Sequence, residues 1–181
     1  MTKSFLFILL FCTAVQASGQ VLTGASARWS DSFREWIIYT EDYNDEGDLH
    51  LRWENGDALS EWDYYFADVS GAIKIKWPKD PSEWEIRSSE GEIVSAKALW
   101  NNSFREWRIS NNDIQITLTC RYNSTWDEWE VHGNYGNLSI YTAYEGDPRD
   151  WVVIDELDED VPSAMRMAIL FVVLYHSSPR F

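Results

Sequence analysis

The sequence predicts a mainly β protein with one C-terminal α-helix. We expect about twelve antiparallel strands, arranged as six hairpin repeats that close into a barrel around the helix. Three observations lead to this fold class. A pair formed by an acidic residue and Trp recurs along the chain, a second aromatic series runs in step with it, and the last thirty residues break the pattern with a long apolar segment.

Residues 1–19 are expected to form a cleaved signal peptide that exports the protein to the periplasm or the extracellular space. Lys3 supplies the positive start, Phe5–Phe11 is an apolar run, and the small residues at Ala17 and Gly19 fit cleavage sites. The alternatives are a buried strand or a membrane anchor. The apolar run is too short to span a bilayer, which favours the signal peptide.

The repeat lies in residues 21–155, within a single expected domain of residues 20–181. Six tryptophans follow an acidic residue, at spacings of 26, 22, 23, 22 and 22: Trp36, Trp62, Trp84, Trp107, Trp129 and Trp151. Six further aromatic residues interleave with them, at spacings of 24, 24, 23, 22 and 22: Trp29, Trp53, Trp77, Trp100, Tyr122 and Tyr144. The fragment Ser-Phe-Arg-Glu-Trp occurs at residues 32–36 and again at 103–107. Two series in step indicate six copies of one supersecondary unit.

Each unit is predicted to contain two strands. The first strand alternates apolar and polar residues, which is typical of a half-buried strand. Examples of its apolar positions are Leu49-Leu51-Trp53 and Ile73-Ile75-Trp77. The second strand begins at the acidic residue and its Trp, and turn residues such as Asn, Gly, Asp and Pro separate the two strands. We expect the Trp of each pair to point into the core and the acidic residue beside it to point outward.

The apolar segment near the C-terminus is predicted to be a helix over about residues 161–176. Arg166 is its only charge, so the helix is apolar on every side and needs complete burial, with Ile169 and Phe171 in the core. The acidic run 155–160 is interpreted as a favourable charge ahead of the helix N-terminus. A sheet with one large apolar face must be covered or must close, and a barrel of about twelve strands needs filling. The helix can therefore fill the barrel, and the barrel can bury the apolar helix.

Charge excludes several kinds of partner. The 181 residues carry 30 acidic and 15 basic side chains, a net charge of −15, with a pI of about 4.4. Such a chain repels phosphate, so we expect no nucleic-acid partner and no binding of anionic phospholipid through a basic patch. A protein or glycan partner is compatible with the composition, and the oligomeric state is not predicted. Cys12 lies in the expected signal peptide, which leaves Cys120 as a buried, inert thiol.

No catalytic motif stands out in the sequence. His50, His132 and His176 lack the spacing of metal ligands, and no nucleophile elbow, zinc-protease motif or phosphate loop occurs. The chain is therefore expected to be a non-enzyme without a cofactor. Asp127 and Glu128 could serve acid–base chemistry on a glycan. The Glu-Trp pair recurs in five of the six units, however, which favours a structural role for its glutamate.

Two sets of residues are weak candidates for binding. Asp42, Asn44, Glu46 and Asp48 partly resemble the first half of a calcium loop, although the position of its bidentate Glu is taken by Trp53. A solvated acidic turn is the alternative interpretation. The aromatic residues that fall off the buried alternation could stack on a sugar or a partner, or simply cover a neighbouring side chain. They are Tyr65, Trp126 and Tyr141.

Six hairpins followed by a uniformly apolar helix resemble the tubby-like β-barrel superfamily, which includes tubby C-terminal domains, LURP-one-related proteins and phospholipid scramblases. The resemblance covers residues 21–181 and rests on the Trp-x-Ile hairpins, on residues 150–153 and on Met165–Tyr175. It implies a barrel around a central helix. Tubby domains bind phosphoinositides through basic residues, and no basic cluster here matches them. The cysteine-rich segment of scramblases is also missing.

The sequence leads to three functional hypotheses. The first is an exported, non-catalytic, acidic barrel with a binding or scaffolding role in the cell envelope or outside the cell. The second is a secreted carbohydrate-binding or carbohydrate-active protein that uses exposed aromatic residues and acidic loops. The third is a membrane-associated protein whose apolar C-terminal helix enters lipid.

Overall fold

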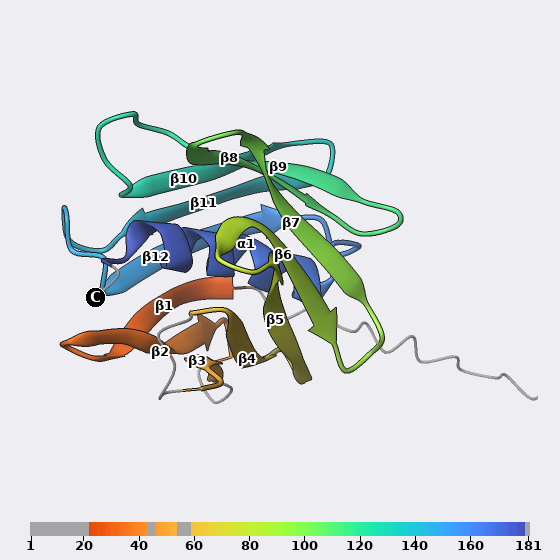
Figure 1. Ribbon diagram of the computed structural model, residues 1–181, viewed down its shortest axis with the longest axis horizontal. Coiled ribbons are helices and arrows are strands. Elements are labelled where there is room, and N and C mark those ends of the chain that lie inside the picture. The colour runs from red at the N-terminus through yellow and green to blue at the C-terminus, as the bar shows by residue number, and fades with distance from the viewer. Residues whose placement is uncertain (1–21, 43–45, 54–58, 180–181) are drawn as a thin grey trace, which may run out of the picture.

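The computed structural model describes residues 22–42, 46–53 and 59–179. Twelve strands form a closed barrel, and one helix lies inside it (Figure 1). The elements are β1 (Leu22–Trp29), β2 (Ser32–Thr40), β3 (Gly47–Leu51), β4 (Glu61–Phe66), β5 (Val69–Trp77), β6 (Asp80–Ser88), β7 (Ile93–Trp100), β8 (Ser103–Ser110), β9 (Gln115–Cys120), β10 (Glu128–Gly133), β11 (Gly136–Thr142), β12 (Asp150–Leu157) and α1 (Ser163–Ser177).

Each strand pairs antiparallel with its neighbours in the sequence, and β12 closes the barrel against β1. In the closing pair Gly24 lies opposite Val152 and Ala25 lies opposite Trp151. The predicted fold class is therefore confirmed: mainly β, antiparallel, closed, with one C-terminal helix. Closure leaves no unpaired sheet edge, and the apolar faces of all strands point to one interior.

The six tryptophans that follow an acidic residue form one buried layer inside the barrel. Each is at most 3% exposed. Each indole Nε1–H donates to the backbone carbonyl three residues earlier, over 2.9 to 3.3 Å, so that the same bond occurs in every repeat. A buried indole needs a partner for its N–H. The backbone three residues earlier, in the preceding turn or at the start of the same strand, supplies that partner locally, which explains why Trp can recur at this position.

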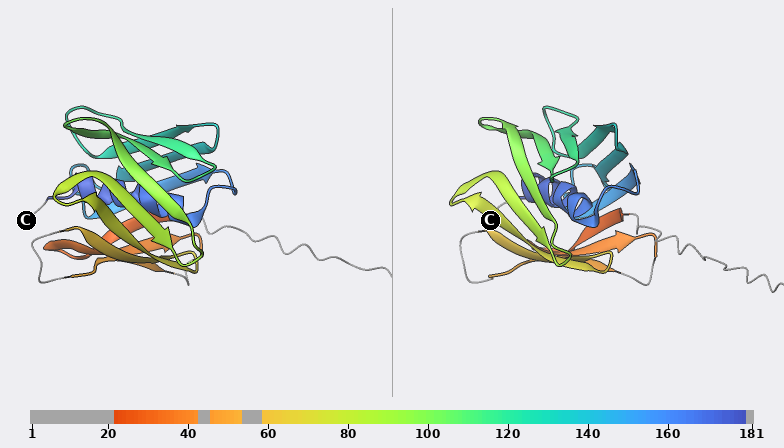
Figure 2. Two further views of the ribbon diagram at one scale, coloured as in Figure 1. Left: turned by 45° about the vertical axis from the view of Figure 1, so that its right-hand side comes forward. Right: turned by 90° about the vertical axis from the view of Figure 1, so that its right-hand side faces the viewer.

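The helix α1 fills the barrel, as the two views of Figure 2 show. Ile169 and Phe171 are at most 1% exposed. The Phe171 ring packs edge-on against Trp62 and Trp84, with ring centroids 5.8 and 4.8 Å apart. Within the described ranges, no helix has both the length and the apolar character needed to cross a membrane.

The helix begins at Ser163, two residues later than the start predicted near residue 161. Pro162 precedes it with extended backbone angles of −64° and 153°. A residue before proline is also biased toward extended structure, which keeps Val161 out of the helix. The chain therefore makes its turn from β12 into the barrel before the first helical residue.

Arg166 anchors the helix where the chain enters the barrel. Its guanidinium donates to the carboxylate of Asp155 over 2.9 Å and to the carbonyls of Val161, Leu157 and Asp158. The Asp155 side chain is fully buried. The residues of the acidic run lie ahead of the helix, as the sequence indicates, and the first turn of α1 itself holds no acidic residue. Asp155 compensates a buried arginine, which is the alternative to leaving that charge unpaired.

We expect Phe171→Ala to lower the free energy of unfolding by about 3–5 kcal/mol, because it opens a cavity between the helix and the Trp layer. Urea unfolding followed by tryptophan fluorescence measures the change. Ile93→Ala is the control, since Ile93 is 51% exposed, and it should change stability by less than about 0.5 kcal/mol. A similar small effect of Phe171→Ala would contradict the central packing of α1.

Arg166→Ala should destabilise the fold by about 3–5 kcal/mol, because it leaves the buried Asp155 carboxylate without its partner. The double variant Arg166→Met with Asp155→Leu should lose much less unfolding free energy than the sum of the losses in Arg166→Met alone and Asp155→Leu alone. Chemical unfolding of the four proteins in this double-mutant cycle measures the coupling. Additive effects would show that the two side chains do not stabilise each other.

Candidate functional site

One end of the barrel carries a ring of exposed aromatic side chains. The turns from each odd-numbered strand to the next even-numbered strand lie at this end, which we call the aromatic end. Its six aromatic residues are between 46% and 69% exposed: Trp29, Trp53, Trp77, Trp100, Tyr122 and Tyr144. The C-terminal end of α1 also lies here, on the left in Figure 1.

The exposure of Trp53 and Trp77 corrects the sequence prediction, in which both continue the apolar face of their strands. Trp53 lies beyond the end of β3. Trp77 follows a shift in the β5–β6 register between Ile75 and Trp77. Equivalent shifts precede Trp29 in β1 and Trp100 in β7. An extra residue in one strand reverses the side-chain alternation, so the aromatic residue turns outward.

In three of the six units, an exposed tryptophan accounts for the acidic residue of the repeat. The indole N–H groups of Trp53, Trp77 and Trp100 donate to Glu61, Glu83 and Glu106, over 3.3, 3.1 and 2.7 Å. Each of these glutamates directly precedes a buried Trp. Two adjacent residues of one strand therefore connect the buried tryptophans inside the barrel with the exposed tryptophans outside it. Burial opposes ionisation of Glu83, but hydrogen bonds from Lys76 and Trp77 outweigh it and lower the pKa of this carboxyl.

The repeat is broken at two adjacent turns of the aromatic end. The turns β1–β2, β5–β6 and β7–β8 contain two residues each. Residues 52–60 join β3 to β4, and β9–β10 and β11–β12 are joined by residues 121–127 and 143–149, seven each. In these same two units the exposed aromatic residue is Tyr122 or Tyr144 instead of Trp. Binding sites are concentrated in loops held by a rigid scaffold, so a departure shared by two neighbouring units marks a candidate site.

The two long turns border an open groove of about 720 Å³. Its aromatic lining consists of Tyr122 and Tyr141, and its hydroxyl groups come from Ser124, Thr125 and Thr142. Its carboxylates come from Asp127, Glu128 and Glu145. Glu128 is paired with Arg121, whose guanidinium also lies 5.6 Å from the centre of the Tyr122 ring. The volume of the groove is within the range of small-molecule sites, about 300–1,000 Å³.

Arg105 holds one wall of the groove. It enters from β8 and donates to the carbonyls of Tyr122 and Thr125, the latter over 2.7 Å. It also lies 4.1 Å from the centre of the Trp126 ring. Ser177 of α1 donates to the Trp126 carbonyl over 3.1 Å. The turn 121–127 is therefore held both by Arg105 of β8 and by Ser177 of α1.

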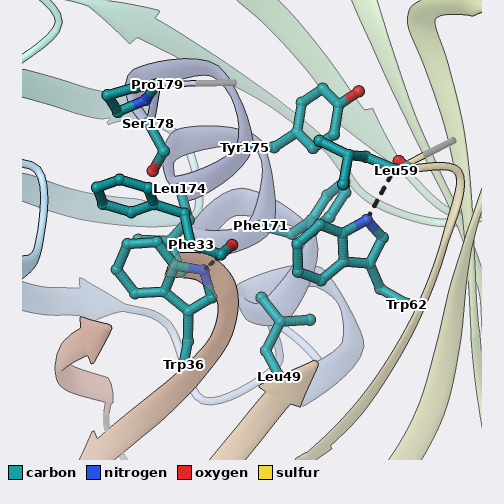
Figure 3. A pocket seen from close by; sticks show the side chains of 10 residues that line it. All are labelled: Phe33, Trp36, Leu49, Leu59, Trp62, Phe171, Leu174, Tyr175, Ser178 and Pro179. Carbon is teal, nitrogen blue, oxygen red and sulfur yellow. Dashed lines mark hydrogen bonds between the residues drawn. The ribbon is translucent and has the colours of Figure 1, made fainter. Parts of the chain in front are cut away.

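A second hollow lies at the mouth of the barrel beside the end of α1. Figure 3 shows Phe33, Trp36, Leu59, Trp62 and Tyr175 among its lining residues. It measures about 20 Å³ and is mostly apolar. This is about the space of one water molecule, and an apolar cavity of that size stays dry. This hollow is therefore too small for a ligand, and the groove on the exterior is the better candidate site.

The two ends of the barrel differ in charge. The described turns at the end opposite the aromatic end hold ten acidic side chains and no basic one: Glu41, Asp42, Glu46, Asp68, Glu90, Glu92, Asp113, Asp158, Glu159 and Asp160. The described turns of the aromatic end hold four of each sign: Asp31, Asp127, Glu145 and Asp147 with Arg52, Lys79, Arg121 and Arg149. In the described turns, the excess of negative charge thus lies at the opposite end.

The three aromatic candidates from the sequence do not gather at one site, since two lie at the groove and one lies near the opposite end of the barrel. Tyr141 lines the groove, and Trp126 lies beside it but is half-buried against Arg105 and Trp129. Tyr65 lies on β4 near the opposite end, where its hydroxyl donates to Asp68 over 2.9 Å. Asp127 and Glu128 both line the groove.

The calcium candidates lie at the opposite end. Asn44 falls outside the described residues, and Asp48 contacts His50 Nδ1 over 2.6 Å. Among the described residues, no three His, Cys, Asp or Glu side chains gather as metal ligands. Calcium binding by Asp42, Asn44, Glu46 and Asp48 stays a prediction.

Sequence reasoning missed Arg105 and the aromatic end as a whole. The signal for Arg105 was present, because it belongs to the second copy of Ser-Phe-Arg-Glu-Trp. Cys120, which is 5% exposed, also contacts Arg105 at 3.1 Å. Burial raises the pKa of its thiol despite the nearby positive charge, so the thiol stays protonated and inert.

Comparison with protein-family models, with curated proteins and with solved structures finds no match to this chain.

Arg105→Ala should loosen residues 121–127, because the carbonyls of Tyr122 and Thr125 lose their donor. The Thr142 amide, which donates to the Asp127 carbonyl over 3.0 Å, should exchange with deuterium at least about tenfold faster, since it is protected by the ordered turn. Arg108→Ala is the matched control, because Arg108 is an exposed residue of the same strand. Equal exchange in both variants would contradict the positioning role of Arg105.

Proposed function

We propose that this protein is an exported, non-catalytic binding protein that acts through its aromatic end, in the cell envelope or the extracellular space. The observation that carries the proposal is the gathering of six exposed aromatic residues at equivalent positions around one end. Exposed Trp and Tyr supply large contact area with little loss of side-chain entropy, and they dominate many binding surfaces.

The distribution of charge also supports the aromatic end as the binding surface. A balanced set of charges lets a partner approach the aromatic end without the repulsion that ten carboxylates create at the opposite end. The aromatic side chains are also held in place, since three of the indoles are bonded to glutamates below them. A pre-ordered surface loses less entropy on binding.

Carbohydrate is a second candidate for what is bound, and the groove favours it. Tyr122 and Tyr141 line the groove together with side-chain hydroxyls and carboxylates. Membrane association through α1 is less favoured, because insertion into lipid would require the helix to leave a barrel in which nearly all of it is buried. Export through residues 1–19 and kinship with the tubby-like superfamily both stay predictions.

An array of glycans and peptides, probed with the purified chain, tests the proposal. We expect Trp77→Ala with Trp100→Ala, Tyr122→Ala and Tyr144→Ala to weaken binding at least about 100-fold, because the changes remove several central contacts at once. Ile93→Ala with Ile154→Ala is the control, since both side chains are about half exposed but neither lies in a turn of the aromatic end. Equal binding by the two variants, or no binding by the natural chain, would overturn the proposal.

A further inference from the structure

We infer that the groove between residues 121–127 and 143–149 binds an uncharged glycan and selects against acidic ones. This inference rests on the proposed binding function, and it names the class of ligand. It starts from the groove as the one place where two neighbouring hairpins of the described repeat depart together from the others.

The lining of the groove matches the surface of a sugar. Tyr122 and Tyr141 place two aromatic rings in this lining, and an aromatic ring can stack on the apolar C–H face of a pyranose. Asp127, Glu128 and Glu145 accept hydrogen bonds from hydroxyl groups, and a bond to a carboxylate is stronger than one to a neutral oxygen. The side-chain hydroxyls in the same lining can donate and accept. A ligand that combines many O–H donors with an apolar ring face satisfies all three kinds of group.

The charge of the groove determines which sugars fit. No side chain that lines it is basic, and Arg121, which lies beside it, is already paired with Glu128. Within the described part of the chain, Asp127 and Glu145 have no ion pair of their own. A uronate or sulfate group would approach these two carboxylates without a compensating cation. Like charges at close range are costly, so acidic glycans are rejected.

The groove is formed before a ligand arrives. Arg105 ties the Tyr122 and Thr125 carbonyls to β8, and the Thr142 amide ties β11 to the Asp127 carbonyl over 3.0 Å. Ser177 connects the same turn to the central helix. In the second wall, the Pro148 carbonyl accepts from the buried Trp151 indole over 2.9 Å and the Arg149 carbonyl accepts from the Ala27 amide over 2.7 Å, so both walls are joined to the barrel. Rigid walls reduce the ordering cost of binding a flexible oligosaccharide, which makes a shallow groove sufficient.

The test compares neutral, acidic and amino-bearing oligosaccharides of the same length, as probes on one glycan array and then by calorimetry. We expect binding of neutral members and none of their uronic-acid counterparts. Tyr141→Ala should weaken binding about tenfold, because it removes a stacking ring. Tyr65→Ala is the matched control, since it removes the same side chain near the opposite end of the barrel.

A second variant tests the selection against negative charge. Asp127→Asn with Glu145→Gln should retain the neutral ligand within about threefold and should gain measurable binding of the acidic one, because amides still accept hydrogen bonds but do not repel anions. A purely structural role of these residues would not produce this change in preference.

The outcomes separate the inference from the function on which it rests. Neutral glycans that bind without any effect of Tyr141→Ala, or peptides that bind in their place, would overturn the glycan groove and leave the aromatic end as the binding surface. Stronger, salt-sensitive binding of amino sugars would also overturn it, since the carboxylates would then act as ion-pair partners. No binding of any probe would overturn both.

Discussion

The structure depends on one hydrogen bond that is repeated six times, from a buried indole N–H to the carbonyl three residues before it. The bond satisfies the indole N–H, so a tryptophan can be buried in the core in the second strand of every hairpin. Because successive residues of a strand face opposite sides, the acidic neighbour must then point outward. There Glu61, Glu83 and Glu106 receive the indoles of the exposed tryptophans. One local bond thus positions both aromatic layers.

The inner layer also determines where function can lie. Six tryptophans and an apolar helix occupy the barrel and leave little more than the space of one water at its mouth. A barrel of this size would otherwise enclose a ligand, as other wide barrels do. Here the helix takes that place, and its Arg166–Asp155 pair holds it at the point of entry. Recognition is left to the outer surface and to the turns.

Much of the fold could be predicted from the sequence, because the period of the aromatic residues and the uniform apolarity of the last segment are global signals. The exposure of Trp53 and Trp77 could not, since simple alternation does not reveal where a strand ends or shifts its register. The groove was also hidden. Tyr141 stood out as an aromatic residue off the buried pattern, but its proximity to Tyr122 and Asp127 depends on the pairing of β10 with β11. The segregation of charge depends in the same way on which turns share an end.

The repeat itself helps to separate structure from function. A feature present in all six units, such as the indole bond, is explained by the barrel and needs no ligand. The combination of a long turn with an exposed Tyr in place of Trp is confined to two neighbouring units, at 121–127 and 143–149, and needs another cause. Longer turns cost loop entropy. Arg105 and Ser177 nevertheless hold the first of them in one conformation. An ordered departure from an otherwise regular repeat is most simply explained by recognition at that place.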